Sequence, residues 1–126
     1  MTARVRVPLL VFVGSALGTG ARALVGSLPA PTGAWPWGTF GANITGAFLL
    51  GCLLARYASR HTAVATVAFL GTGVLGSYTT FSAFSEETRA LLAAGEGSLA
   101  VTYVVVSLIV GVGVAQAGIQ FVRMRA

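Results

Sequence analysis

The residues best suited to chemistry in this sequence are small polar groups that interrupt an apolar stretch, residues 71–87 (GTGVLGSYTTFSAFSEE). Three glycines fall within six positions, and hydroxyls that compete for the bonds of a helical backbone follow them. A broken helix there would free carbonyls, which suit Na⁺, and N–H groups, which suit anions. The alternative is that the hydroxyls bond back to an unbroken helix. The interrupting residues are Gly76, Ser77, Thr79, Thr80, Ser82 and Ser85.

Two aromatic rings and one amide add to this polar cluster. Phe81 and Phe84 are three residues apart, so they share one face of a helix. The positive edge of an aromatic ring can meet an anion while the ring still repels bulk water. Asn43, the only amide in the first three apolar stretches, can donate its NH₂ group to a partly dehydrated anion. The alternatives are packing for the rings and a hydrogen bond between helices for the amide.

Three further residues extend the candidate pathway. Tyr103 and Ser107 are four apart, so their hydroxyls lie on one helix face, either as a row of donors or as bonds between helices. Arg22 lies 16 residues beyond Arg6. That separation is about 24 Å along a helix and puts Arg22 near the far side of a membrane. There it either reaches the lipid headgroups or attracts anions to an electropositive entrance.

The composition requires that membrane helices position these residues. The chain has 126 residues, of which 9% are charged, against about 25% in an ordinary soluble domain. So few charges cannot cover the surface of a soluble protein of this size. The composition therefore excludes a soluble monomer and a disordered chain. It also excludes a nucleic-acid binder, because the net charge of +5 comes from scattered arginines.

Long uncharged stretches predict a single all-α domain of four transmembrane helices over residues 1–126. A helix needs about 20 apolar residues to cross the hydrocarbon core of a membrane. The 33 uncharged residues between Arg22 and Arg56 are divided by the turn formers Pro29, Pro31 and Pro36. The predicted spans are residues 5–28, 38–57, 62–94 with a break near 76–80, and 98–122.

The arginines predict the orientation of the chain in the cell inner membrane. With four spans, both termini and the second loop share one side, and that side holds six of the eight arginines. Such an excess predicts that this side is the cytoplasm. Four helices are too few to enclose a pore alone, so we expect an oligomer. The six arginines are Arg4, Arg6, Arg56, Arg60, Arg123 and Arg125, and the other side has at most Arg22 and Arg89.

The same residues argue against several other functions. The sequence has no nucleophile–base pair of a hydrolase and no cluster of metal ligands, so we do not expect an enzyme. A small four-helix multidrug or guanidinium exporter is an alternative, but it needs a carboxylate in its first span, and no acidic residue precedes Glu86. The other alternative is a non-conducting membrane assembly subunit, which is favoured if Asn43, Phe81 and Phe84 face lipid.

Three motifs together resemble the CrcB/Fluc family of fluoride channels, and the resemblance spans most of the chain. They are GSALGTGARALV at 14–25, GTFGANITGAFLLG at 38–51 and GSYTTFSAFSEE at 76–87. The resemblance implies a passive, fluoride-selective channel that lets fluoride out of the cytoplasm and relieves its toxicity. It also implies an antiparallel, dual-topology dimer with two pores and a structural Na⁺ at its centre.

The resemblance also implies roles for individual residues. The main-chain carbonyls of Gly76 and Thr79 would hold the Na⁺, two from each subunit, and Glu87 is expected to be structural. The chain departs from the family pattern at Ala83, where a threonine is common, and Ser82 is the candidate substitute for the missing hydroxyl. The implied fluoride pathway comprises Asn43, Phe81, Phe84, Ser82, Thr80, Tyr103, Ser107 and Arg22.

The uneven distribution of arginines conflicts with a simple dual-topology homodimer. Such a dimer needs half of its chains inserted in each direction, whereas six arginines against two favour one direction. We expect a homodimer. A chain that inserts mainly one way would instead form a heterodimer with an oppositely oriented sister subunit.

Overall fold

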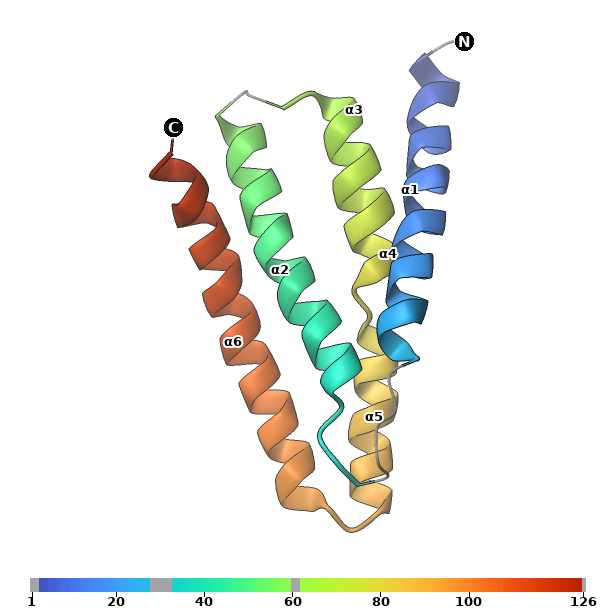
Figure 1. Ribbon diagram of the computed structural model, residues 1–126, viewed down its shortest axis with the longest axis vertical. Helices are drawn as coiled ribbons and strands as arrows, with labels where there is room; N and C mark the ends of the chain where they lie inside the picture. The colour runs from blue at the N-terminus through green and yellow to red at the C-terminus, as the bar shows by residue number, and fades with distance from the viewer. Residues whose placement is uncertain (1–2, 28–32, 60–61, 126) are drawn as a thin grey trace.

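The computed structural model describes residues 3–27, 33–59 and 62–125, in which four helical spans run side by side (Figure 1). Each span is long and apolar enough to cross a membrane, so the expected all-α membrane architecture is confirmed. The first, second and fourth spans are continuous helices, whereas the third is built from four pieces. The elements are α1 (Ala3–Gly26), α2 (Trp37–Ala58), α3 (Val64–Thr66), the π-helix η1 (Val67–Leu75), α4 (Gly76–Tyr78), α5 (Phe81–Ala93) and α6 (Gly97–Arg123).

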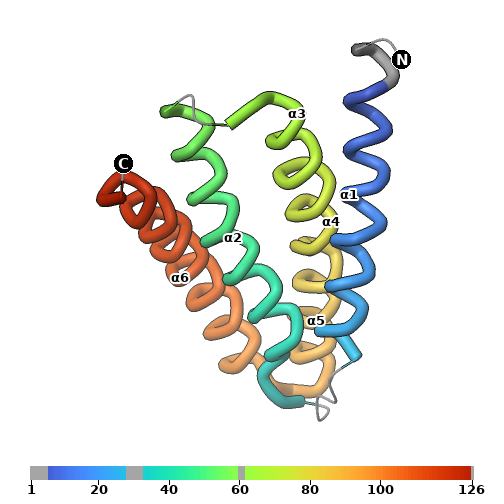
Figure 2. Tube along the Cα trace, turned by 45° about the horizontal axis from the view of Figure 1, so that its top comes forward, coloured from blue at the N-terminus to red at the C-terminus, as the bar shows by residue number. Residues whose placement is uncertain are grey.

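The spans follow one another across the bundle in the order α6, α2, third span and α1 (Figure 1, Figure 2). α2 packs mainly against α6, and α1 packs mainly against η1 and α4. The beginning of α1, the end of α2 and the end of α6 lie at one end of the bundle, and the turn from α5 into α6 lies at the other (Figure 1). Arg6, Arg56 and Arg123 therefore lie at the same end of the bundle.

Glycines let α2 and α6 approach closely. A side chain at Gly51 would collide with the backbone of Ala115, and one at Gly118 would collide with the backbone of Phe48. The Cys52 thiol donates to the Gly118 carbonyl at 3.4 Å across the same contact. Close packing of this kind holds helices together in a membrane, because lipid gives no hydrophobic drive for their association.

α1 packs against the π-helix η1 in the same way. Gly14 of α1 faces the backbone of Phe69 and Gly73, and Gly18 faces the backbone of Val74. π-Helical turns are rare and frequently occur at functional sites. Here nine π-helical residues lead directly into the short helix α4, which is the last part of the third span before the break.

The break expected in the third span is confirmed, and it lies at Thr79 and Thr80. Both residues are extended, with φ/ψ of −77°/154° and −148°/126°. The Thr79 hydroxyl donates to the Leu75 carbonyl at 3.0 Å and closes the end of α4. The Thr80 hydroxyl accepts the Ala83 N–H at 3.2 Å and caps α5. One hydroxyl thus bonds back to its own helix, while the next one starts a new helix.

Candidate anion pathway

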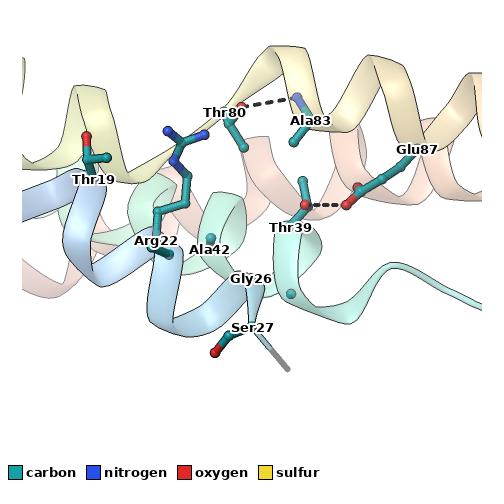
Figure 3. Close-up of a pocket in the computed structure, with 11 residues that line it drawn as sticks. Thr19, Arg22, Gly26, Ser27, Thr39, Ala42, Thr80, Ala83 and Glu87 are labelled. Atoms are coloured by element: carbon teal, nitrogen blue, oxygen red, sulfur yellow. Dashed lines mark hydrogen bonds between the residues drawn. The ribbon is translucent and has the colours of Figure 1, made fainter. Parts of the chain in front are cut away.

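Two cavities flank the break, and Thr80 lines both of them. The larger, which we call the vestibule, has a volume of about 470 Å³ and lies between α1, α2 and α5 (Figure 3). The smaller, which we call the groove, has a volume of about 260 Å³ and lies between α2, α5 and α6. The vestibule is lined by Thr19, Arg22, Ala23, Gly26, Ser27, Gly38, Thr39, Ala42, Thr80, Ala83 and Glu87, and the groove by Asn43, Thr79, Thr80, Phe81, Phe84, Ser107 and Leu108.

Asn43 of α2 forms hydrogen bonds to the backbone at the break. Its Nδ2 donates to the Thr80 carbonyl at 3.0 Å, and its Oδ1 accepts the Thr80 N–H at 2.8 Å. The amide oxygen therefore replaces the helical partner that the Thr80 N–H loses at the break, and the NH₂ group adds a second bond to the Thr80 carbonyl, which as the N-cap of α5 also accepts the first bond of that helix. An NH₂ group carries two hydrogens, so its second hydrogen is available to another acceptor in the groove. Asn43 thus makes the interhelical bond and keeps a donor for an anion.

The groove combines two aromatic rings with one hydroxyl that lacks a partner. The centroids of the Phe81 and Phe84 rings lie 6.0 Å apart, so the spacing of three residues does place them together. The Ser107 hydroxyl oxygen is buried, and it has no hydrogen-bond partner among the residues that the structure describes. A buried hydroxyl without a partner costs free energy, and an anion in the groove would accept its hydrogen.

Tyr103 lies outside the groove, although it shares a helix face with Ser107. Its side chain is fully buried, and its hydroxyl donates to Glu87 Oε2 at 2.9 Å. Thr39 of α2 donates to Glu87 Oε1 at 2.6 Å, so two hydroxyls hold this carboxylate. Side chains on a helix point toward its N-terminus, and this direction carries the long Tyr103 side chain away from Ser107 toward α5. Tyr103 instead packs its ring against Phe84, with 5.1 Å between centroids.

Arg22 brings a positive charge to the vestibule. Its side chain extends from α1 toward the third span, and Glu87 lies further along α5 (Figure 3). In the described part of the chain the one ion pair joins Arg89 to Glu86 on the surface, so Arg22 is not neutralised by a partner there. An unpaired guanidinium beside a cavity attracts anions into it. The vestibule thus has one guanidinium and one carboxylate in its lining, and no ion pair between these two groups is seen in the described residues.

Comparison with known proteins decides the family. The sequence model of the family described as CrcB-like protein, Camphor Resistance (CrcB), matches residues 9–119. The chain belongs to the CrcB/FluC family. It is similar to a protein of Nitrobacter winogradskyi named fluoride-specific ion channel FluC, with 42% identity over 122 residues that cover 92% of this chain and 94% of that protein. A FluC protein of Caulobacter vibrioides is 39% identical over 119 residues, or 91% and 94% of the two chains.

The structure brings most of the expected pathway residues of this CrcB/FluC chain together. Asn43, Thr80, Phe81, Phe84 and Ser107 line the groove, and Arg22 lines the vestibule. Ser82 lies beside them, with its oxygen 3.1 Å from that of Thr80, whereas Ala83 brings only a methyl group to the vestibule. Sequence reasoning missed Thr39, Thr45 and Tyr78, because single hydroxyls on apolar helices show no spacing that reveals their partners.

Proposed function

We propose that this chain forms a passive, fluoride-selective channel in the cell inner membrane. Its relatives are named fluoride-specific ion channels. The observation that carries the proposal is the groove beside the break, where an amide, an unpartnered hydroxyl and two phenyl rings surround a space without any charged lining residue among those described. Fluoride holds its water tightly, so a pathway must offer compact donors in place of water.

Weak binding of fluoride along the groove favours its rapid passage. A site that binds an ion too tightly cannot release it, and the groove offers neutral donors rather than lysine or arginine. Arg22 stands in the wider vestibule, where it raises the local concentration of anions without fixing them at the narrow part. Fluoride that accumulates in the cytoplasm would leave down its own gradient. Neither the attraction of anions into the vestibule nor the exit of fluoride down its gradient requires an enzyme.

Fluoride efflux from proteoliposomes that contain the purified protein tests this function. With a fluoride-selective electrode outside, we expect fluoride to leave without ATP or a proton gradient while chloride is retained. Equal rates for the two halides would overturn the proposal in favour of an unselective pore. Efflux that requires a proton gradient would favour the exporter, and no transport at all would favour a non-conducting assembly subunit.

A structural Na⁺ at the break is part of this proposal. In a continuous helix the N–H groups of Thr80 and Ala83 would donate to the carbonyls of Gly76 and Thr79, four residues earlier. Instead the Thr80 N–H donates to Asn43, and the Ala83 N–H donates to the Thr80 hydroxyl. This leaves the Gly76 and Thr79 carbonyls without their helical donors, and such carbonyls suit Na⁺. The bound cation would supply positive charge that holds the two broken helices of a dimer together.

Removal of Na⁺ is expected to destabilise the assembled protein, because a ligand that binds only the native state stabilises it by mass action. The measurement is the melting temperature of the purified protein in sodium buffer and in N-methylglucamine buffer of equal ionic strength. We expect a lower melting temperature and slower fluoride efflux without Na⁺. Identical melting curves in both buffers would contradict a structural Na⁺.

A second subunit is needed to complete the pathway, and we propose an antiparallel dimer. Phe81 and Leu108, which line the groove, have 79% and 61% of their surface exposed. Non-helical backbone at membrane depth is tolerated only inside protein or beside water, so lipid cannot cover the break at Thr79 and Thr80. A second chain across the groove would bury these two side chains and close the wall of the pore. A homodimer is our first choice, and an oppositely oriented sister subunit is the other.

Labelling of a terminal tag from each side of the membrane separates these two dimers. Arg6, Arg56, Arg123 and Arg125 lie toward one end of the bundle and favour insertion with that end in the cytoplasm. Equal labelling of the tag from both sides would establish dual topology and eliminate the heterodimer. Labelling from the cytoplasmic side alone would require a sister subunit.

A further inference from the structure

Three consecutive residues at the break, 78–80, each contact α2 in a different way. One is joined by a hydroxyl–hydroxyl bond, one by a methyl group that fits against a glycine, and one by the amide described above. The three contacts fall within four consecutive residues of α2. This short stretch of α2 therefore holds the backbone at the break in place. The contacts are Tyr78 with Thr45, Thr79 with Gly46, and Thr80 with Asn43.

The bond between Tyr78 and Thr45 has a defined direction. The two hydroxyl oxygens are 3.1 Å apart, and Thr45 donates its own hydrogen to the Gly41 carbonyl at 2.7 Å. Tyr78 therefore donates to Thr45. The ring of Tyr78 also passes beside Gly46, where an added side chain would come within 3.5 Å of the ring. These contacts attach the last residue of α4 to α2.

α4 depends on such an attachment because it has little stability of its own. It consists of three residues between a π-helix and two extended residues. A helix of one turn is unstable without tertiary contacts. Rotation of α4 would redirect the carbonyls of Gly76, its first residue, and of Thr79, the residue that follows it. The position of Tyr78 therefore decides where those carbonyls point.

We propose that Tyr78 and Thr45 are positioning residues for the fluoride pathway, acting through the orientation of α4 and of the Gly76 and Thr79 carbonyls. This inference rests on the proposed channel function and on the Na⁺ site. Asn43 fixes Thr80, the second residue of the break, and the pair of hydroxyls fixes Tyr78, the residue before the break. Neither hydroxyl lines the groove or the vestibule, so their effect on the anion is indirect.

The test compares Tyr78→Phe, Thr45→Val and the double variant with the wild-type chain in proteoliposomes. Loss of one hydrogen bond should slow fluoride efflux by about two- to tenfold. It should also raise the Na⁺ concentration that gives half-maximal efflux. The double variant should be no slower than either single one, because both remove the same bond. Thr45→Ser, which keeps the hydroxyl, should restore the wild-type rate.

Two matched controls lie elsewhere in the chain. Tyr57→Phe removes an exposed tyrosine hydroxyl from the end of α2, and Thr102→Val removes a threonine hydroxyl that bonds only to its own helix, at the Ser98 carbonyl. Both should conduct fluoride as the wild type does. Wild-type rates and an unchanged Na⁺ requirement in Tyr78→Phe would overturn the inference. So would additive losses in the double variant. Failure of the wild-type chain to conduct fluoride would instead refute the proposed function.

Discussion

Asn43→Leu is expected to slow fluoride efflux about a hundredfold. Leucine has the same branching and the same number of side-chain heavy atoms as asparagine but no polar group. The substitution removes both hydrogen bonds to the Thr80 backbone and leaves the Thr80 N–H without a partner at membrane depth. An unsatisfied buried group costs about 1–3 kcal/mol, and about 1.4 kcal/mol corresponds to a tenfold change in rate. The unpaired Thr80 N–H and the loss of the NH₂ donor to the anion together account for a hundredfold effect.

The control for Asn43→Leu is Gln116→Leu, which removes an exposed amide from α6. Gln116 lines neither cavity, so its replacement should leave fluoride efflux unchanged. Size-exclusion chromatography shows whether each variant remains assembled, and the efflux rates are compared for the assembled fraction. Wild-type efflux from assembled Asn43→Leu would mean that the amide neither holds the break nor serves the anion.

The architecture follows from local features of the sequence. Uncharged stretches of sufficient length determine the four spans whatever surrounds them. The run of glycines and hydroxyls near residues 76–80 weakens the third helix, so the approximate position of its break is also predictable. The two extended residues are not predictable from this run alone. They are determined by Asn43, which lies 37 residues away in the sequence and bonds to only one of several candidate threonines.

The candidate site was predicted less completely, for two physical reasons. The spacing of Tyr103 and Ser107 gives their common helix face but not the direction of a long side chain. The hydroxyl of Tyr103 consequently reaches Glu87 and not the groove. The π-helix η1 has no sequence signature, because it depends on contact with Gly14 and Gly18 of α1. Both features arise from contacts between spans, which a single sequence does not reveal.

The second large effect is expected from silver ions acting on a cysteine in the groove. In a Cys52→Ser background, Ser107→Cys places a thiol where the buried hydroxyl lies, and Leu108→Cys places one at another position of the groove. Soft cations bind thiolates strongly. A silver ion bound to the thiolate would occupy the pathway and block it. Efflux through either variant should therefore stop when silver is added, and each variant is compared with its own efflux before the addition.

Ile109→Cys is the matched control, because Ile109 is on the same helix, is 68% exposed and lines neither cavity. Silver block of the groove cysteines is the most direct measurement of whether fluoride passes beside the broken third span. We predict complete loss of efflux for Ser107→Cys and Leu108→Cys, and none for Ile109→Cys. Undiminished fluoride efflux through fully silver-bound groove variants would contradict a pathway at the break.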